Sequence, residues 1–176
     1  MSDEKSIRVV YDPQIFLLQK YGGISRYFVS LVKEFQANPK LGITPIVDAR
    51  ASCNEYALSE LPGIDLVRVT GTFHSLAALA REVARPLSHY KHADIVHSTF
   101  YLPGFLRRGS HLPKVVTLFD MIPENTPRGI KFWNPHFLKK TYLRQASAVV
   151  SISDASTQDM LREYRLPITA STIYSG

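Results

Sequence analysis

Short runs of aliphatic, largely β-branched residues recur along the chain, and segments with helical periodicity separate most of them. Residues 114–118 (KVVTL) and 148–152 (AVVSI) are the clearest examples. Near-continuous apolar strands that alternate with helices are typical of a parallel sheet covered on both faces. The pattern predicts an α/β fold built on a Rossmann-like, doubly wound, mostly parallel sheet. The predicted strands are residues 7–11, 44–47, 66–69, 95–97, 114–118, 148–152 and 171–174.

The helical segments place their apolar residues on one face. The first predicted helix opens after Gly22 and Gly23 and ends at Asn38-Pro39. Its apolar positions follow the spacing of a single helix face: Ile24, Phe28, Leu31, Val32 and Phe35. The other predicted helices cover residues 75–90, 134–145 and 153–164. Residues 12–23 are predicted to be a long loop.

Length and composition fit one domain with a phosphate-bearing partner. The 176 residues are 45% hydrophobic, which argues against disorder. The net charge of +6, from 21 Lys and Arg against 15 Asp and Glu, favours nucleotides, nucleic acid or an anionic membrane. A single cysteine, Cys53, cannot form an internal disulfide or a zinc cluster, and no secretory leader or membrane-spanning run is recognisable. We therefore expect a cytoplasmic location.

The loops after the strands are expected to carry the function, because open α/β sheets bind ligands beyond the carboxyl ends of their strands. Gly22 and Gly23 open a helix in the first such loop, where bare amides and the helix dipole favour phosphate. Arg26 lies in the first turn and is positioned to reach the same anion. The alternative is an ordinary tight turn before a helix with a solvated arginine.

Later loops supply candidate acid–base and hydrogen-bonding groups. His97 ends a predicted strand and is followed by Ser98 and Tyr101, and Asp120 follows residues 114–118. A histidine or carboxylate at this edge can hold or accept a hydroxyl proton. The alternatives are a satisfied, partly buried histidine and a carboxylate that caps backbone amides. Ser153 is either a helix cap or a ligand-facing hydroxyl.

A stretch rich in basic and aromatic residues lies between Glu124 and Asp154. No acidic residue occurs between Glu124 and Asp154. A mixture of cations and aromatic residues can lie on an anionic membrane surface, and a solvated basic helix face with aromatic core residues is the alternative. Nucleic acid is disfavoured, because the stretch lacks the pattern of a base-reading motif. The predicted membrane contacts are Lys131, Trp133, Lys139, Lys140 and Arg144.

Taken in order, five segments resemble the N-terminal half of a family 4 glycosyltransferase with the GT-B fold. They are YGGISRYF, ADIVHSTFYLP, PKVVTLFDMIPE, ASAVVSISDASTQDML and TIYSG, which span nearly the whole chain. The resemblance implies a retaining, metal-independent transferase in which two Rossmann-like domains face a cleft. The N-terminal domain mainly holds the acceptor, and the C-terminal domain mainly holds the nucleotide-sugar donor.

The resemblance also implies roles for individual residues. Gly22 and Gly23 match the loop that approaches the donor diphosphate, and His97 matches a strand-end histidine on the acceptor side. Asp120 matches the aspartate of a His-Asp pair whose histidine is Phe119 here. The base that activates the acceptor is then Asp120, His97 or the leaving phosphate itself. Ser153 matches a helix-opening serine in the last cleft loop.

We therefore expect residues 1–176 to be the N-terminal domain of a transferase that glycosylates a glycan or lipid-linked acceptor, in bacterial surface-polysaccharide or lipopolysaccharide assembly. The C-terminal donor-binding domain is absent from this sequence, so the 176 residues alone are expected to be inactive. Two other hypotheses remain: an epimerase of GT-B shape that acts on nucleotide sugars, and a non-catalytic module that binds glycan or phosphate. No resident cofactor is expected.

Overall fold

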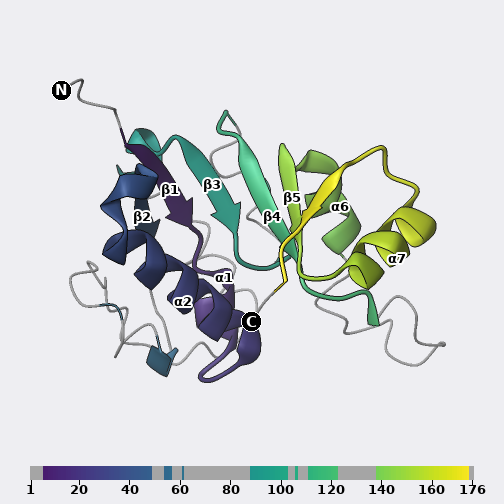
Figure 1. The fold of residues 1–176 in the computed structure, drawn as a ribbon, viewed down its shortest axis with the longest axis horizontal. Helices are drawn as coiled ribbons and strands as arrows, with labels where there is room; N and C mark the ends of the chain where they lie inside the picture. The colour runs from purple at the N-terminus through teal and green to yellow at the C-terminus, as the bar shows by residue number, and fades with distance from the viewer. Residues whose placement is uncertain are drawn as a thin grey trace.

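A six-stranded parallel sheet organises the computed structural model, which describes residues 6–48, 54–56, 61, 88–102, 106, 111–122 and 138–174. The strand order is β2-β1-β3-β4-β5-β6, and each neighbouring pair is parallel. Figure 1 shows the strands running side by side with helices against the sheet. The predicted α/β, Rossmann-like architecture is confirmed. The strands are β1 (Ile7–Tyr11), β2 (Ile43–Val47), β3 (Ile95–Ser98), β4 (Lys114–Leu118), β5 (Ala148–Ser151) and β6 (Ala170–Thr172).

The strand predictions agree with the structure to within one or two residues at the ends. Residues 7–11 and 114–118 match β1 and β4, and β6 begins and ends slightly earlier than predicted. The strand predicted at 66–69 lies outside the described residues. Buried valines and aliphatic neighbours explain this agreement, because a strand covered on both faces reads as an apolar run.

The helices confirm most of the predicted pattern and correct one segment. The predicted loop at 12–23 contains a short helix, α1 (Gln14–Leu18), whose first residues Gln14, Ile15 and Phe16 are buried. Its sequence is too short to show helical periodicity, and tertiary contacts stabilise it. Helix α2 (Gly23–Ala37) ends before Asn38 as predicted. The others are α6 (Lys139–Gln145), α7 (Asp154–Tyr164) and the 3-10 turns at Pro39–Leu41 and Ser88–His92.

Two of these helices fall in predicted helical segments. The described part of the segment predicted at 134–145 is α6, and residues 134–137 lie outside the described residues. Helix α7 begins after Ser153, whose hydroxyl accepts a hydrogen bond from the Ser156 amide, so the predicted cap is confirmed. Most of the segment predicted at 75–90 is also outside the described residues, and Ser88–His92 forms a 3-10 turn.

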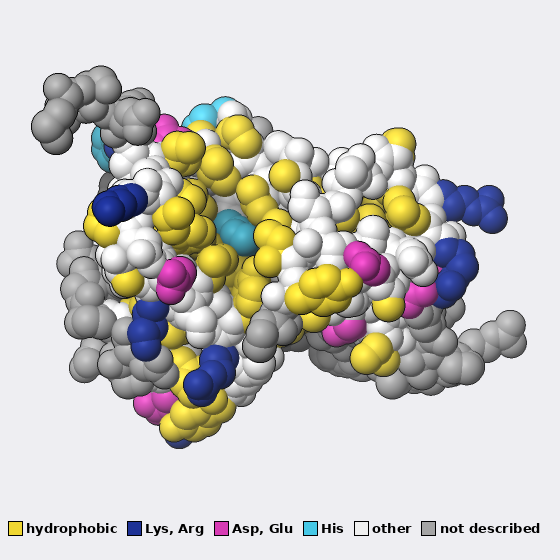
Figure 2. Space-filling view, viewed as in Figure 1, with side chains coloured by type: hydrophobic (Ala, Val, Ile, Leu, Met, Phe, Trp, Pro, Cys, Tyr) yellow, Lys and Arg dark blue, Asp and Glu magenta, His cyan; other side chains and the backbone are white. Residues whose placement is uncertain are grey.

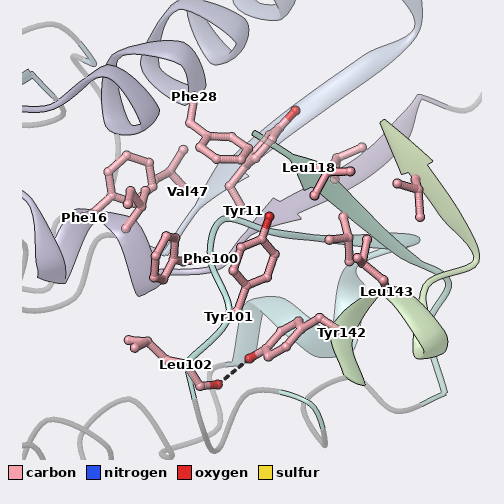
Figure 3. Close-up of a cluster of buried hydrophobic side chains, with 14 of the residues drawn as sticks. Tyr11, Phe16, Phe28, Val47, Phe100, Tyr101, Leu102, Leu118, Tyr142 and Leu143 are labelled. Atoms are coloured by element: carbon pink, nitrogen blue, oxygen red, sulfur yellow. Dashed lines mark hydrogen bonds between the residues drawn. The ribbon is translucent and has the colours of Figure 1, made fainter. Parts of the chain in front are cut away.

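The main core lies between the sheet and its helices and is rich in aromatic residues. Tyr11, Phe16 and Phe28 are almost fully buried, as is Leu143 of α6. Figure 3 shows Tyr101 and Tyr142 extending this cluster, with the Tyr142 hydroxyl donating to the Leu102 carbonyl at 2.5 Å. Burial of side chains of this size is the main stabilising term for such a domain.

The sheet topology points to one edge for ligand binding. The chain leaves β1 toward β2 on one side, and β3 to β6 follow on the other. The direction therefore reverses between β1 and β3. In open α/β sheets, crevices form beyond the carboxyl ends of the strands near such a reversal.

Candidate active site

A cleft of about 770 Å³ opens at the carboxyl edge of the sheet. Its wall on α2 consists of Gly23, Ile24, Arg26, Tyr27, Ser30 and Leu31, and the opposite wall comes from residues after the strands: Phe119, Asp120, Ile152 and Tyr174. Figure 2 shows hydrophobic side chains gathered in the middle of this face. The loops after β4, β5 and β6 therefore meet the N-terminal half of α2.

The N-terminus of α2 is shaped by the two glycines. A Cβ on Gly22 would meet the Gln19 carboxamide at 2.2 Å, whereas a Cβ on Gly23 would meet nothing within 4 Å. The close approach lets Gln19 Oε1 accept a hydrogen bond from the Ser25 amide at 3.2 Å. One of the amides that a helix start leaves free is thus already capped by the protein. Gly23 itself lines the cleft, and Gly22 supports the turn beside it.

Arg26 and Asp120 supply charges of opposite sign to the two walls. Arg26 is exposed, and its guanidinium lies over the Tyr56 ring at 5.5 Å. The Asp120 side chain is 37% exposed, and its Oδ1 lies 3.8 Å from the Lys139 ammonium. The same Oδ1 accepts a hydrogen bond from the Ile122 amide. The cleft can therefore hold an anion near α2 and a hydroxyl near β4.

His97 lies inside the core beside this cleft. Its ring is packed 5.2 Å from the rings of both Tyr11 and Phe28, and it is only 6% exposed. Nε2 is 2.8 Å from the Thr117 hydroxyl. Burial lowers the pKa of His97 to about 3, so the imidazole is neutral at physiological pH. A group with so low a pKa is a weak general base.

A comparison with known protein families matches the part of the chain that forms this cleft. The family model "Glycosyltransferase Family 4" matches residues 21–176, which cover the cleft and five of the six strands. The chain belongs to glycosyltransferase family 4. No curated protein matches the chain. Membership in the family supports glycosyltransferase activity in general.

The structure brings some of the predicted site residues to the cleft of this family 4 domain. Gly23, Arg26 and Asp120 line it together, although they are far apart in the sequence. Ser153 caps α7, and its hydroxyl is also 3.0 Å from that of Ser156. Ser153 thus has the capping role that was the alternative to a ligand contact.

Three other predicted acceptor contacts lie deeper. Ser98 and His97 are 5% and 6% exposed, and Tyr101 is 2% exposed. The Tyr101 hydroxyl donates to the Thr117 carbonyl at 2.7 Å. None of the three is among the residues that line the described cleft. These three side chains therefore pack in the interior near the carboxyl ends of β3 and β4.

A buried polar cluster was missed by the sequence analysis. Asp12 follows β1, and its carboxylate accepts hydrogen bonds from the Thr99 amide at 3.0 Å and hydroxyl at 2.7 Å. The Gln14 side chain also donates to it, at 2.6 Å. Burial, the largest cause, raises the pKa of Asp12 to about 6 although these hydrogen bonds lower it. We call Asp12, Gln14 and Thr99 the β1–β3 clamp. An aspartate directly after a strand was the signal that could have revealed it.

The predicted membrane contacts divide into two groups. Lys139 is fully buried, and its ammonium donates to the Asp120 carbonyl at 2.7 Å and lies 5.7 Å from the centre of the Tyr101 ring. The prediction for Lys139 is therefore wrong, because its side chain is buried and its ammonium contacts Asp120 and Tyr101. Lys140 and Arg144 are exposed on α6. Lys131 and Trp133 lie outside the described residues.

Two features are absent from the described residues. No group of three or more His, Cys, Asp or Glu side chains is arranged there to hold a metal ion. No helix in the described ranges is long and apolar enough to cross a membrane.

Proposed function

We propose that this chain is the acceptor-side half of a retaining glycosyltransferase that moves a sugar from a nucleotide-sugar donor to a glycan or lipid-linked acceptor. The proposed setting is bacterial surface-polysaccharide assembly at the cytoplasmic side of the membrane. The proposal includes a second, donor-binding domain that faces the cleft. Transfer without a bound metal ion stays a prediction.

The observation that carries the proposal is the meeting of Gly23 and Arg26 with Asp120 across one cleft. The start of α2 and the Arg26 guanidinium form an electropositive side, which suits a diphosphate that gains charge as it leaves. Asp120 projects from the opposite wall, where a carboxylate can orient an acceptor hydroxyl. Both reactants of a transfer would then meet within this space.

The placement of His97 favours Asp120 for the acceptor side. His97 is buried and its pKa is lowered to about 3 by burial, so it is a poor proton acceptor near neutral pH. Asp120 is partly exposed in the cleft. In the proposed reaction Asp120 holds the acceptor hydroxyl, and the proton passes to Asp120 or to the departing phosphate. The bond from sugar to phosphate breaks as the bond to the acceptor oxygen forms.

The test is a kinetic comparison in the full-length enzyme, with UDP-, GDP- and ADP-hexoses as donors and product analysis by mass spectrometry. Arg26→Gln is expected to raise the donor KM about tenfold, the effect of one charge-assisted contact. Lys33→Gln is the matched control: it makes the same charge change two turns along α2, away from the cleft, and should leave the donor KM unchanged. Asp120→Asn is expected to lower kcat with the acceptor.

Several results would contradict the proposal. Epimerised donor without a glycosylated product would favour the epimerase hypothesis. Equal effects of Arg26→Gln and Lys33→Gln would show that net charge, and not the cleft, affects donor binding. Residues 1–176 alone are expected to show no turnover, and measurable transfer by them would remove the need for a second domain.

A further inference from the structure

The cleft has an aromatic corner that the proposed roles of Arg26 and Asp120 leave unused. Tyr27 and Phe119 line it from opposite walls, and their rings lie 5.4 Å apart at 88°. Tyr27 is also edge-on to Phe28 at 5.1 Å. Both side chains are half-buried, so part of each ring faces the cleft and part is packed. Phe28 and the sheet stand behind the corner.

The Tyr27 ring is held from inside the protein. Burial, the larger effect, raises the pKa of Tyr27, and the nearby Thr117 hydroxyl lowers it. Thr117 is 1% exposed, and its hydroxyl also lies 2.8 Å from His97 Nε2. His97 is in turn fixed between Tyr11 and Phe28. The Thr117 hydroxyl thus fixes His97, His97 packs against Phe28, and Phe28 packs against the Tyr27 ring of the cleft wall.

We propose that Tyr27 and Phe119 form a subsite for one pyranose ring of the acceptor, and that Thr117 and His97 are positioning residues which hold the Tyr27 ring. This inference rests on the proposed transferase function. A pyranose presents an apolar C–H face that packs on aromatic rings, with hydroxyls around its edge. Asp120 and Ser30, both lining the cleft, are the polar groups beside the corner that can bind those hydroxyls.

Buried His97 then has a positioning role that requires no proton transfer. A ring held by its packed neighbours loses less freedom when a sugar packs on it, and preorganisation of this kind improves affinity. The acceptor KM should then depend on the Thr117 hydroxyl, although that hydroxyl need not touch the acceptor. The donor KM should not depend on it.

Steady-state kinetics of the full-length enzyme can separate the contribution of the Tyr27 ring from that of the residues behind it. Tyr27→Leu removes the ring and is expected to raise the acceptor KM about tenfold or more. Thr117→Val keeps the shape and removes the hydroxyl that fixes His97, and it should raise the acceptor KM about threefold. Thr117→Ser keeps the hydroxyl and should behave like the wild type. Tyr164→Phe is the matched control, because it removes the hydroxyl of a tyrosine that ends α7 and does not line the cleft.

A binding measurement keeps the test independent of turnover. Saturation-transfer NMR with methyl hexopyranosides should label the sugar-ring protons with wild-type protein and lose that signal with Tyr27→Leu. Circular dichroism checks that the variant is folded. Equal signals from folded Tyr27→Leu and wild type, or an unchanged acceptor KM, would overturn the subsite. If methyl hexopyranosides bind through Tyr27 but no donor is turned over, the transferase proposal fails and the subsite stands.

Discussion

Two polar clusters lie at the same edge of the sheet, and they differ in how their hydrogen-bonding groups are used. The β1–β3 clamp is buried, and its members bond to one another: Asp12 accepts from Thr99 and Gln14. The cleft beyond β4 to β6 contains polar groups that remain partly exposed, such as Asp120. Buried polar groups that satisfy each other stabilise a fold, whereas groups left toward a cavity are free to meet a ligand. The first cluster joins two loops, and the second is a candidate binding site.

The comparison also explains why position after a strand is an incomplete guide. Asp12 and Asp120 both follow strands, yet their surroundings differ. Asp12 receives hydrogen bonds from an amide and a hydroxyl of Thr99 and has almost no exposed surface. Asp120 is held on one side by Lys139 and Ile122, and its other side faces the cleft. The two aspartates are the same residue type, and the difference in their burial is what distinguishes a structural carboxylate from a candidate ligand-binding one.

The largest expected effect concerns His97. Its folded-state pKa of about 3 lies below the ordinary value, so the unfolded chain binds a proton that the folded protein excludes. This contribution to stability is complete above the unfolded pKa of about 6.5 and is lost as the pH falls, by about 3 kcal/mol at pH 4. Urea unfolding measured between pH 4 and 8 should show the loss in the wild type. It should be absent from a folded His97→Gln variant, and an identical profile would contradict the account.

Asp12 should have the opposite pH dependence. Its folded pKa of about 6 is above the ordinary value, so the folded protein holds the proton more tightly than the unfolded chain does. The contribution is complete below pH about 4 and is lost as the pH rises through about 6, a change of about 3 kcal/mol. We expect Asp12→Asn to abolish this dependence in urea titrations, which leaves the His97 dependence visible. Parallel profiles for Asp12→Asn and wild type would be the opposite result.

Removing one hydroxyl from each cluster compares their contributions to stability, and Thr99→Val does so in the clamp with little change in side-chain shape. The Thr99 hydroxyl lies 2.7 Å from Asp12 Oδ1 and accepts from the Ile15 amide at 3.1 Å. Its loss leaves buried partners unsatisfied, so we expect a loss of about 2 kcal/mol in the free energy of unfolding. Ser30→Ala removes a hydroxyl from the cleft and should change stability by less than about 0.5 kcal/mol. Similar losses from both variants would remove the distinction.

The smallest expected effect lies in the glycine pair. Gly22→Ala forces the Gln19 carboxamide away from the Ser25 amide, and loss of this cap should cost about 1 kcal/mol. Gly23→Ala meets open space and should cost nothing or stabilise slightly, because alanine favours helix. Thermal unfolding of the two variants is the measurement. A larger loss for Gly23→Ala would contradict the role given to Gln19.

The sequence predicted the sheet better than it predicted the site, for physical reasons. Strands such as β4 are apolar runs because both of their faces are covered, so local sequence carries their signal. Arg26 and Asp120 were found because each follows a recognisable turn or strand. The clamp, the burial of Lys139 and the Tyr27–Thr117–His97 contacts depend on segments far apart in the chain. No local pattern contains that information.

The central claim is that the cleft binds ligand and the β1–β3 clamp does not. Amide chemical-shift mapping of the full-length enzyme with UDP, and then GDP, tests it most directly. We expect concentration-dependent shifts at Gly23, Ile24 and Arg26, with the amides of Asp12, Gln14 and Thr99 unchanged. Shifts centred on Asp12 and Thr99, with none at the start of α2, would contradict it.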